Sequence, residues 1–302
     1  YWLFLSNNYD SPEIYACGFS IGVFISLIGT FWIGERLSRD EDYTLPDSWN
    51  SSKSLLISAL PFAVTLGILP YVTKLEKFLL AGLATYDDVS LYHVAQLAWI
   101  AGLMLPQAMR AALLPYLGEV RDKPRKFSSR MLKAHHWTIA ILPVGIISGH
   151  VIVSFSIPRV FDSEYAQAIE IFDILLAGWA MTLLSIPWYV ALQAGKNPWR
   201  FTGLISLVIF AAGLSGWILI PITGVQGAAW ASVIGCSVML SFSKLLCGDS
   251  DRLTDLLGLL CVATCYFLSI NSNLALIGLI TLIPAKTSID FLLAQAEISE
   301  EE

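Results

Sequence analysis

Uncharged apolar stretches recur along most of this 302-residue chain, and polar loops separate them. The hydrocarbon core of a bilayer is about 30 Å thick, so a helix needs roughly 20 apolar residues to cross it. The stretches are continuously apolar and do not alternate with period two, as the strands of a membrane barrel would. The sequence therefore predicts an all-α fold, a polytopic transmembrane helical bundle.

The expected spans number about nine, and the last two are short. They cover residues 12–34, 54–83, 89–117, 136–157, 167–192, 200–221, 225–247, 254–270 and 272–285. Only 14% of the residues are charged, against about a quarter in soluble proteins. Because the chain begins at Tyr1 without a signal-peptide pattern, we expect it to be part of a longer protein.

Lysine and arginine predict the orientation, because cytoplasmic loops carry an excess of both. Fourteen of the 18 lie on one set of alternating loops and three on the other, so we expect a cell-membrane protein with a cytoplasmic C-terminus. The most basic segment, residues 119–136, fits an ordinary cytoplasmic loop or an interfacial helix on anionic lipid. We expect the acidic tail, which ends at Glu302, to be solvated.

Charged side chains inside spans are costly unless they face a cavity or a partner, so they are candidate functional residues. Lys74 and Lys77 share one helix face, where two cations suit a phosphate, and Glu76 is angled away from both. Alternatively, all three lie at the outer interface, with the lysines reaching water. Arg110 has Gln107 one turn earlier but no acidic residue at helical spacing, so it either binds a group from elsewhere or reaches the interface.

A further acidic pair, Glu170 and Asp173, shares a face near the outer end of the fifth expected span. These carboxylates fit a gate with Arg159 or Lys77, a site for a coupling cation, or a plain interface position. The last of these is the commonest situation for charges near a span end. The sequence leaves the three readings open.

The remaining polar residues do not make an enzymatic site. Tyr92, His93 and Gln96 form one polar turn at the outer start of the third span, where a lone histidine is more often a hydrogen-bonded residue than a proton carrier. The five cysteines lie in or beside apolar spans without the partners of a metal site. No phosphate-binding loop is present. We therefore expect no enzyme activity, no catalytic residue, no metal and no cofactor.

Four segments, taken in order, carry a resemblance. They are VFDSEYAQA (160–168), LLAG (175–178), IPWYVALQAGK (186–196) and ILIPITGVQGAAWAS (218–232). Together they resemble polysaccharide-exporter flippases of the O-antigen type, in the multidrug/oligosaccharidyl-lipid/polysaccharide superfamily, and the last is similar to the IPxxGxxGAAxA pattern of that family. The resemblance covers about residues 54–247. Many relatives carry an Asp-Arg pair where this chain reads KLEK (74–77).

The resemblance implies two six-helix lobes that move polyprenyl-diphosphate-linked glycans across the membrane by alternating access. It divides the chain into 1–53, the last helix of the preceding half with a linker; 54–247, a six-helix C-terminal lobe; and 248–302, two short helices and a tail. The implied partners are the lipid-linked glycan, membrane lipid and the missing N-terminal lobe, without nucleic acid. The implied substrate-binding residues are Lys74, Lys77, Arg110, Gln107 and Tyr92, and those for gating or ion coupling are Glu76, Glu170, Asp173 and Arg159.

Other functions stay open. A cation-coupled multidrug exporter of the same superfamily requires carboxylates deep in a lobe, whereas Glu170 and Asp173 lie near a span end. A membrane-embedded polysaccharide polymerase or glycosyltransferase usually presents catalytic residues on a long outer loop, and the expected outer loops are short. A structural membrane subunit has no transport path. A cavity lined by the charges named above would separate transport from that role.

Overall fold

The computed structural model of the protein describes residues 49–161, 163–195, 197–248, 254, 256–260, 263 and 281–300. Every regular element in this part is helical, which confirms the all-α class for the described residues. The chain divides into Tyr1–Ser58 and Ala59–Glu302, and the packing below belongs to the second unit. The first expected span and most of the last two lie outside the described residues.

Among the described residues, five segments are long and apolar enough to cross a membrane, which indicates a membrane-embedded helical protein. They are Tyr86–Gly118, Pro124–Val160, Glu164–Ala194, Pro198–Thr223 and Val225–Cys247, and the shorter apolar helix Ala59–Thr73 precedes them. The fourth to seventh expected spans are therefore confirmed as helices of sufficient length, and the third lies in a helical segment that is divided at Leu103. The second expected span, 54–83, is not one continuous helix.

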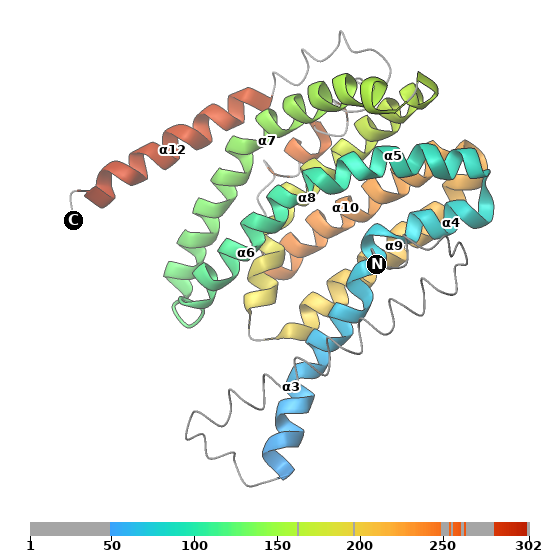
Figure 1. The fold of residues 1–302 in the computed structure, drawn as a ribbon. Helices are drawn as coiled ribbons and strands as arrows, with labels where there is room; N and C mark the ends of the chain where they lie inside the picture. Colours follow the sequence, from blue (N-terminus) through green and yellow to red (C-terminus); the bar gives the residue numbers. More distant parts are fainter. Residues whose placement is uncertain are drawn as a thin grey trace, which may run out of the picture. The chain divides into compact units, whose positions relative to one another are not determined.

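From α3 to α10 the elements follow one another with short connections (Figure 1). They are α3 (Trp49–Ile68), η1 (Leu69–Thr73), α4 (Leu75–Leu83), α5 (Tyr86–Gly102), α6 (Met104–Gly118), α7 (Pro124–Val160), η2 (Ser163–Gln167), α8 (Ala168–Ala194), α9 (Pro198–Thr223), α10 (Val225–Cys247) and α12 (Leu282–Glu300).

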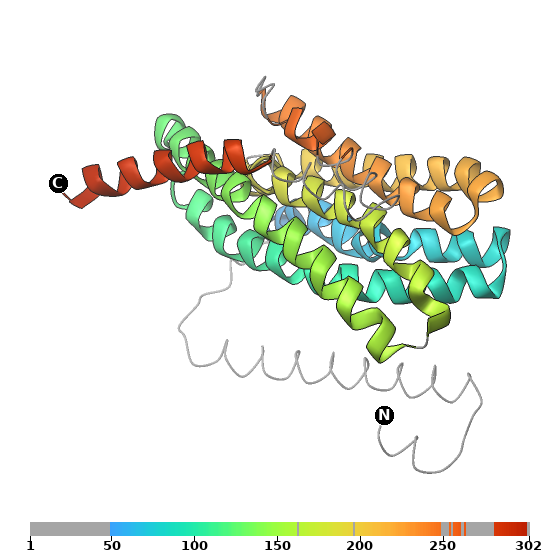
Figure 2. The same cartoon turned by 90° about the horizontal axis from the view of Figure 1, so that it is seen from above.

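The helix α8 is the centre of the second unit. In its most apolar part 83% of the residues are buried, a larger share than in the other four candidate spans. It packs against α5, α6, α7, α9 and α10, and Figure 2 shows it lying between α7 and α10. A helix that is apolar on all sides must be covered by neighbours, and residues 171–181 are such a run, interrupted only by Asp173.

The expected span 54–83 breaks at η1, between α3 and α4. Pro70 has no N–H and disfavours the α conformation in the residue before it, so the chain tightens into a 3₁₀ turn there. The break leaves the carbonyl of Thr73 available, and Nε2 of Gln96 donates a hydrogen bond to it at 2.7 Å. A side chain of α5 therefore stabilises the irregular backbone, as a membrane interior requires.

A second break separates α5 from α6 at Leu103. Pro106 lies four residues after Gly102 and lacks the N–H that would have bonded the Gly102 carbonyl. The indole Nε1 of Trp179 in α8 donates to that carbonyl instead, at 2.9 Å. The expected span 89–117 is thus two helices whose junction is hydrogen-bonded to the central helix.

Close packing of α7 on α8 depends on Gly145. A Cβ atom added there would fall inside van der Waals contact of the Trp179 ring, with Cζ3 at 2.6 Å. We expect Gly145→Ala to lower the free energy of unfolding by about 1–3 kcal/mol, the usual cost of forcing extra volume into a packed interior. The matched variant Gly203→Ala in α9, where the added Cβ has no atom within 4 Å, should not lose stability. Equal melting temperatures in detergent would contradict this packing.

The basic segment after residue 119 is largely helical and continuous with the following span. The helix α7 begins at Pro124, so most of this segment forms its first turns. Nη1 of Arg130 bonds the Glu119 carboxylate at 3.1 Å, and the guanidinium lies 4.2 Å from the centre of the Tyr116 ring. These contacts join the N-terminal part of α7 to the end of α6.

The tail after residue 285 differs from the solvated segment expected from its acidic end. Its described part belongs to α12, which packs against α7. Nδ1 of His136 lies 3.1 Å from Oγ of Ser288, and the rings of His136 and Phe291 are 4.1 Å apart. Tertiary contacts to α7 therefore hold the described part of this helix.

Candidate functional site

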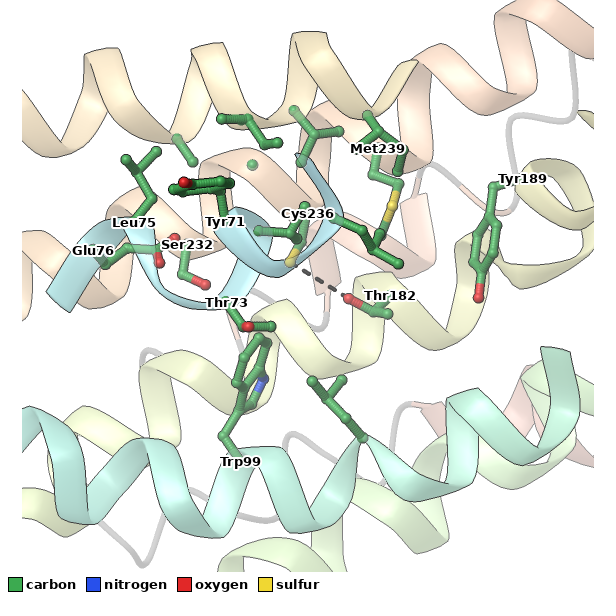
Figure 3. A pocket seen from close by; sticks show the side chains of 18 of the residues that line it. Tyr71, Thr73, Leu75, Glu76, Trp99, Thr182, Tyr189, Ser232, Cys236 and Met239 are labelled. Carbon is green, nitrogen blue, oxygen red and sulfur yellow. Dashed lines mark hydrogen bonds between the residues drawn. The ribbon is translucent and has the colours of Figure 1, made fainter. Parts of the chain in front are cut away.

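A cavity of about 120 Å³ lies inside the bundle, between η1, α4, α5, α6, α8, α9 and α10. Most of its wall is apolar. Figure 3 shows Glu76 and Ser232 toward one end and Tyr189 at the other, with Trp99 of α5 and Thr182 of α8 between them. Arg110 and Gln107 of α6 also line it. Two of the charges singled out in the sequence therefore line one membrane-embedded cavity.

Glu76, at the acidic end of the cavity, is one of several buried polar side chains of α4 and α5 that have an atom without a hydrogen bond. Glu76 is 1% exposed, and its Oε2 has no partner. The same is true of the Tyr92 hydroxyl, Oε1 of Gln96 and Nε1 of Trp99, all on α5. An unpaired buried polar atom costs about 1–3 kcal/mol. The unpaired carboxylate oxygen of Glu76 can bind a proton or a small cation, which would relieve this cost.

The basic end is Arg110, held by two amides. Its Nε donates to Oε1 of Gln193 at 3.1 Å and its Nη1 to Oε1 of Gln107 at 3.4 Å. Within the described part of the chain no carboxylate pairs with it, so these neutral partners orient the guanidinium without compensating its charge. The remaining N–H groups suit a phosphate or a carboxylate, which guanidinium binds in bidentate fashion.

The expected cations Lys74 and Lys77 do not line this cavity. The register explains why: α4 begins at Leu75, which directs Leu75 and Glu76 inward and leaves Lys74 exposed. Nζ of Lys77 lies 2.7 Å from Nδ1 of His93 on the partly exposed side of α4 and α5. Tyr92, expected to contact sugar, is fully buried and is also absent from the lining.

The two acidic residues of α8, Asp173 and Glu170, lie in different environments. Asp173 is buried and its Oδ1 lies 2.7 Å from Nδ1 of His150 on α7, so its partner is neither Arg159 nor Lys77. Glu170 is exposed. The guanidinium of Arg159 lies 3.4 Å from the centre of the Phe155 ring, within its own helix.

His150 and Gln193 were missed by the sequence reasoning. The sequence did contain a signal for His150. Because α7 and α8 are consecutive antiparallel helices, residues at similar distances from the loop between them can meet, and both His150 and Asp173 lie within about three turns of that loop. Gln193 had no comparable signal, because its contact with α6 depends on tertiary packing. In the described part of the chain, no group of histidine, cysteine or acidic residues could hold a metal ion.

Comparisons with family models, with curated proteins and with solved structures gave no match to this chain.

Proposed function

We propose that residues 54–247 form the C-terminal lobe of an alternating-access transporter that moves polyprenyl-diphosphate-linked glycans across the cell membrane. The observation that carries the proposal is Arg110, a cation with amide partners only, at the edge of an internal cavity. An arginine within a membrane span is costly, by up to about 2.5–3.5 kcal/mol at the centre on lenient scales, and commonly marks a substrate path. A polyprenyl-diphosphate headgroup would supply the missing negative charge.

The size of the cavity defines what this lobe contributes. A volume of about 120 Å³ accommodates a phosphate group but not a sugar chain. We assign the diphosphate to Arg110 and Gln107, and the glycan to the space between this lobe and the second one. The role given to Lys74 and Lys77 in the sequence interpretation therefore passes to Arg110.

The test is Arg110→Gln in the full protein. We expect binding of polyprenyl diphosphate in vesicles to weaken by about 10- to 100-fold, because hydrogen bonds to a charged partner contribute about 1.5–3 kcal/mol. Glycan export in cells lacking their own exporter should fall with it. The control is Arg159→Gln, which removes an exposed arginine bonded to its own helix. Unchanged binding and export in Arg110→Gln would overturn the proposal.

A second candidate, a cation-coupled exporter, is favoured by Glu76. That function requires a carboxylate deep in a lobe, and Glu76 lies in the cavity wall with an unpaired oxygen. The two candidate functions use the same lobe and differ in the transported molecule. A cation bound at Glu76 could drive transport of either molecule. Whether transport depends on a proton or sodium gradient tests this coupling.

A further inference from the structure

A second hollow, of about 410 Å³, lies between α5/α6 on one side and α7 on the other, with α8 as its floor. Its rim carries exposed apolar side chains, among them Met104 on α6 and Ile152 on α7. Because these helices cross a membrane, the hollow opens toward hydrocarbon. We call it the apolar groove.

The polar groups of the apolar groove are already bonded to backbone. Oγ of Ser148 donates to the carbonyl of Gly145 at 3.4 Å, and Nε1 of Trp179 donates to Gly102. The other lining residues are apolar, apart from Trp99. The groove therefore offers no free polar group for a charged or sugar-like ligand apart from the indole of Trp99, and its chemistry selects a hydrocarbon.

The apolar groove and the cavity share one wall. Trp99 lines both, and Gly102 of the groove is adjacent to Leu103 of the cavity. Trp99 also carries an unpaired buried Nε1. Arg110 follows on α6, eight residues before the helix ends at Gly118, or about 12 Å along the axis.

We propose that the apolar groove holds the first part of the hydrocarbon tail of the transported lipid while its phosphate binds Arg110; this rests on the function proposed above. A volume of about 410 Å³ accommodates a single hydrocarbon chain. Trp99 separates the two parts of the ligand. The tail is thus bound by α5, α6, α7 and α8 during transport.

The experiment uses two neighbouring positions on α7. Ile152 lines the apolar groove and is 60% exposed, whereas Val151 is 58% exposed and does not line it. A photoreactive benzoylphenylalanine is placed at each in the full protein, in phosphatidylethanolamine vesicles containing polyprenyl diphosphate. We expect polyprenyl adducts, relative to phospholipid adducts, to be several-fold enriched at position 152 over 151. Uncharged polyprenol should show less enrichment than the diphosphate.

Equal enrichment at the two positions, or phospholipid adducts at 152 in the same proportion as at 151, would overturn the groove assignment. If polyprenyl diphosphate does not bind the wild-type protein, the proposed function itself is wrong. If binding depends on Arg110 but adducts are not enriched at position 152, the groove assignment is wrong and the proposed function stands. As a second measurement, Ile152→Trp should weaken binding about tenfold, equivalent to about two methylene groups left unburied, and Val151→Trp should not.

Discussion

His150→Leu is expected to lower the free energy of unfolding by about 3–5 kcal/mol, the cost of removing one partner from a buried polar pair. The variant leaves the Asp173 carboxylate, which is 2% exposed, in the bundle without the imidazole 2.7 Å away. Leucine fills much of the space of the imidazole, so little of the loss comes from a cavity. Denaturant titration in detergent micelles measures the change.

The double variant His150→Leu with Asp173→Leu tests whether the loss of stability comes from the unpaired carboxylate. Replacing both members by apolar residues of similar volume is often neutral or stabilising, so most of the lost stability should return. His93→Leu is the matched control, because His93 is exposed and bonds only the partly exposed Lys77. A double variant as unstable as His150→Leu would show that the pair is not what holds α7 to α8 here.

Glu76→Leu is expected to have opposite effects on stability and on transport. Removing a buried oxygen without a partner should raise the free energy of unfolding by about 1–3 kcal/mol. The same change removes the acceptor that we assign to the coupling cation, so dependence of transport on a proton or sodium gradient should be lost. The measurements are denaturant titration and uptake into vesicles with an imposed gradient.

Glu76→Asp is the conservative control, which keeps the charge and shortens the side chain. It should retain gradient dependence with a weaker apparent affinity for the cation. A structural carboxylate gives a different pattern, with Glu76→Leu destabilised and transport falling only as the folded protein is lost. That pattern would remove ion coupling from this residue.

The spans from α7 to α10 could be predicted because their signal is local, a run of apolar residues of the right length. The two breaks could not, although Pro70 and Pro106 are visible in the sequence. Proline is tolerated in membrane helices when neighbours satisfy the freed groups. Here those neighbours are Gln96 and Trp179, which come from other helices. A break therefore depends on contacts that a single segment does not contain.

The candidate site was predicted in part, for a related reason. The cost of intramembrane charge identified Arg110 and Glu76 as residues that need an explanation. Helical spacing separated Glu76 from Lys74 and Lys77 in the sequence. Which of the two faces turns inward depends on how α4 packs against α9 and α10, and a single segment does not contain that information.

The junction at Leu103 has a mechanical consequence. Leu103 keeps backbone hydrogen bonds to Trp99 and from Gln107, but Pro106 donates none, and the indole of Trp179 bonds the Gly102 carbonyl instead. A bend at this junction therefore breaks fewer bonds within the segment than a bend elsewhere. Trp99 and Arg110 lie on opposite sides of the junction and both line the cavity, so a change in the bend angle would change the distance between them.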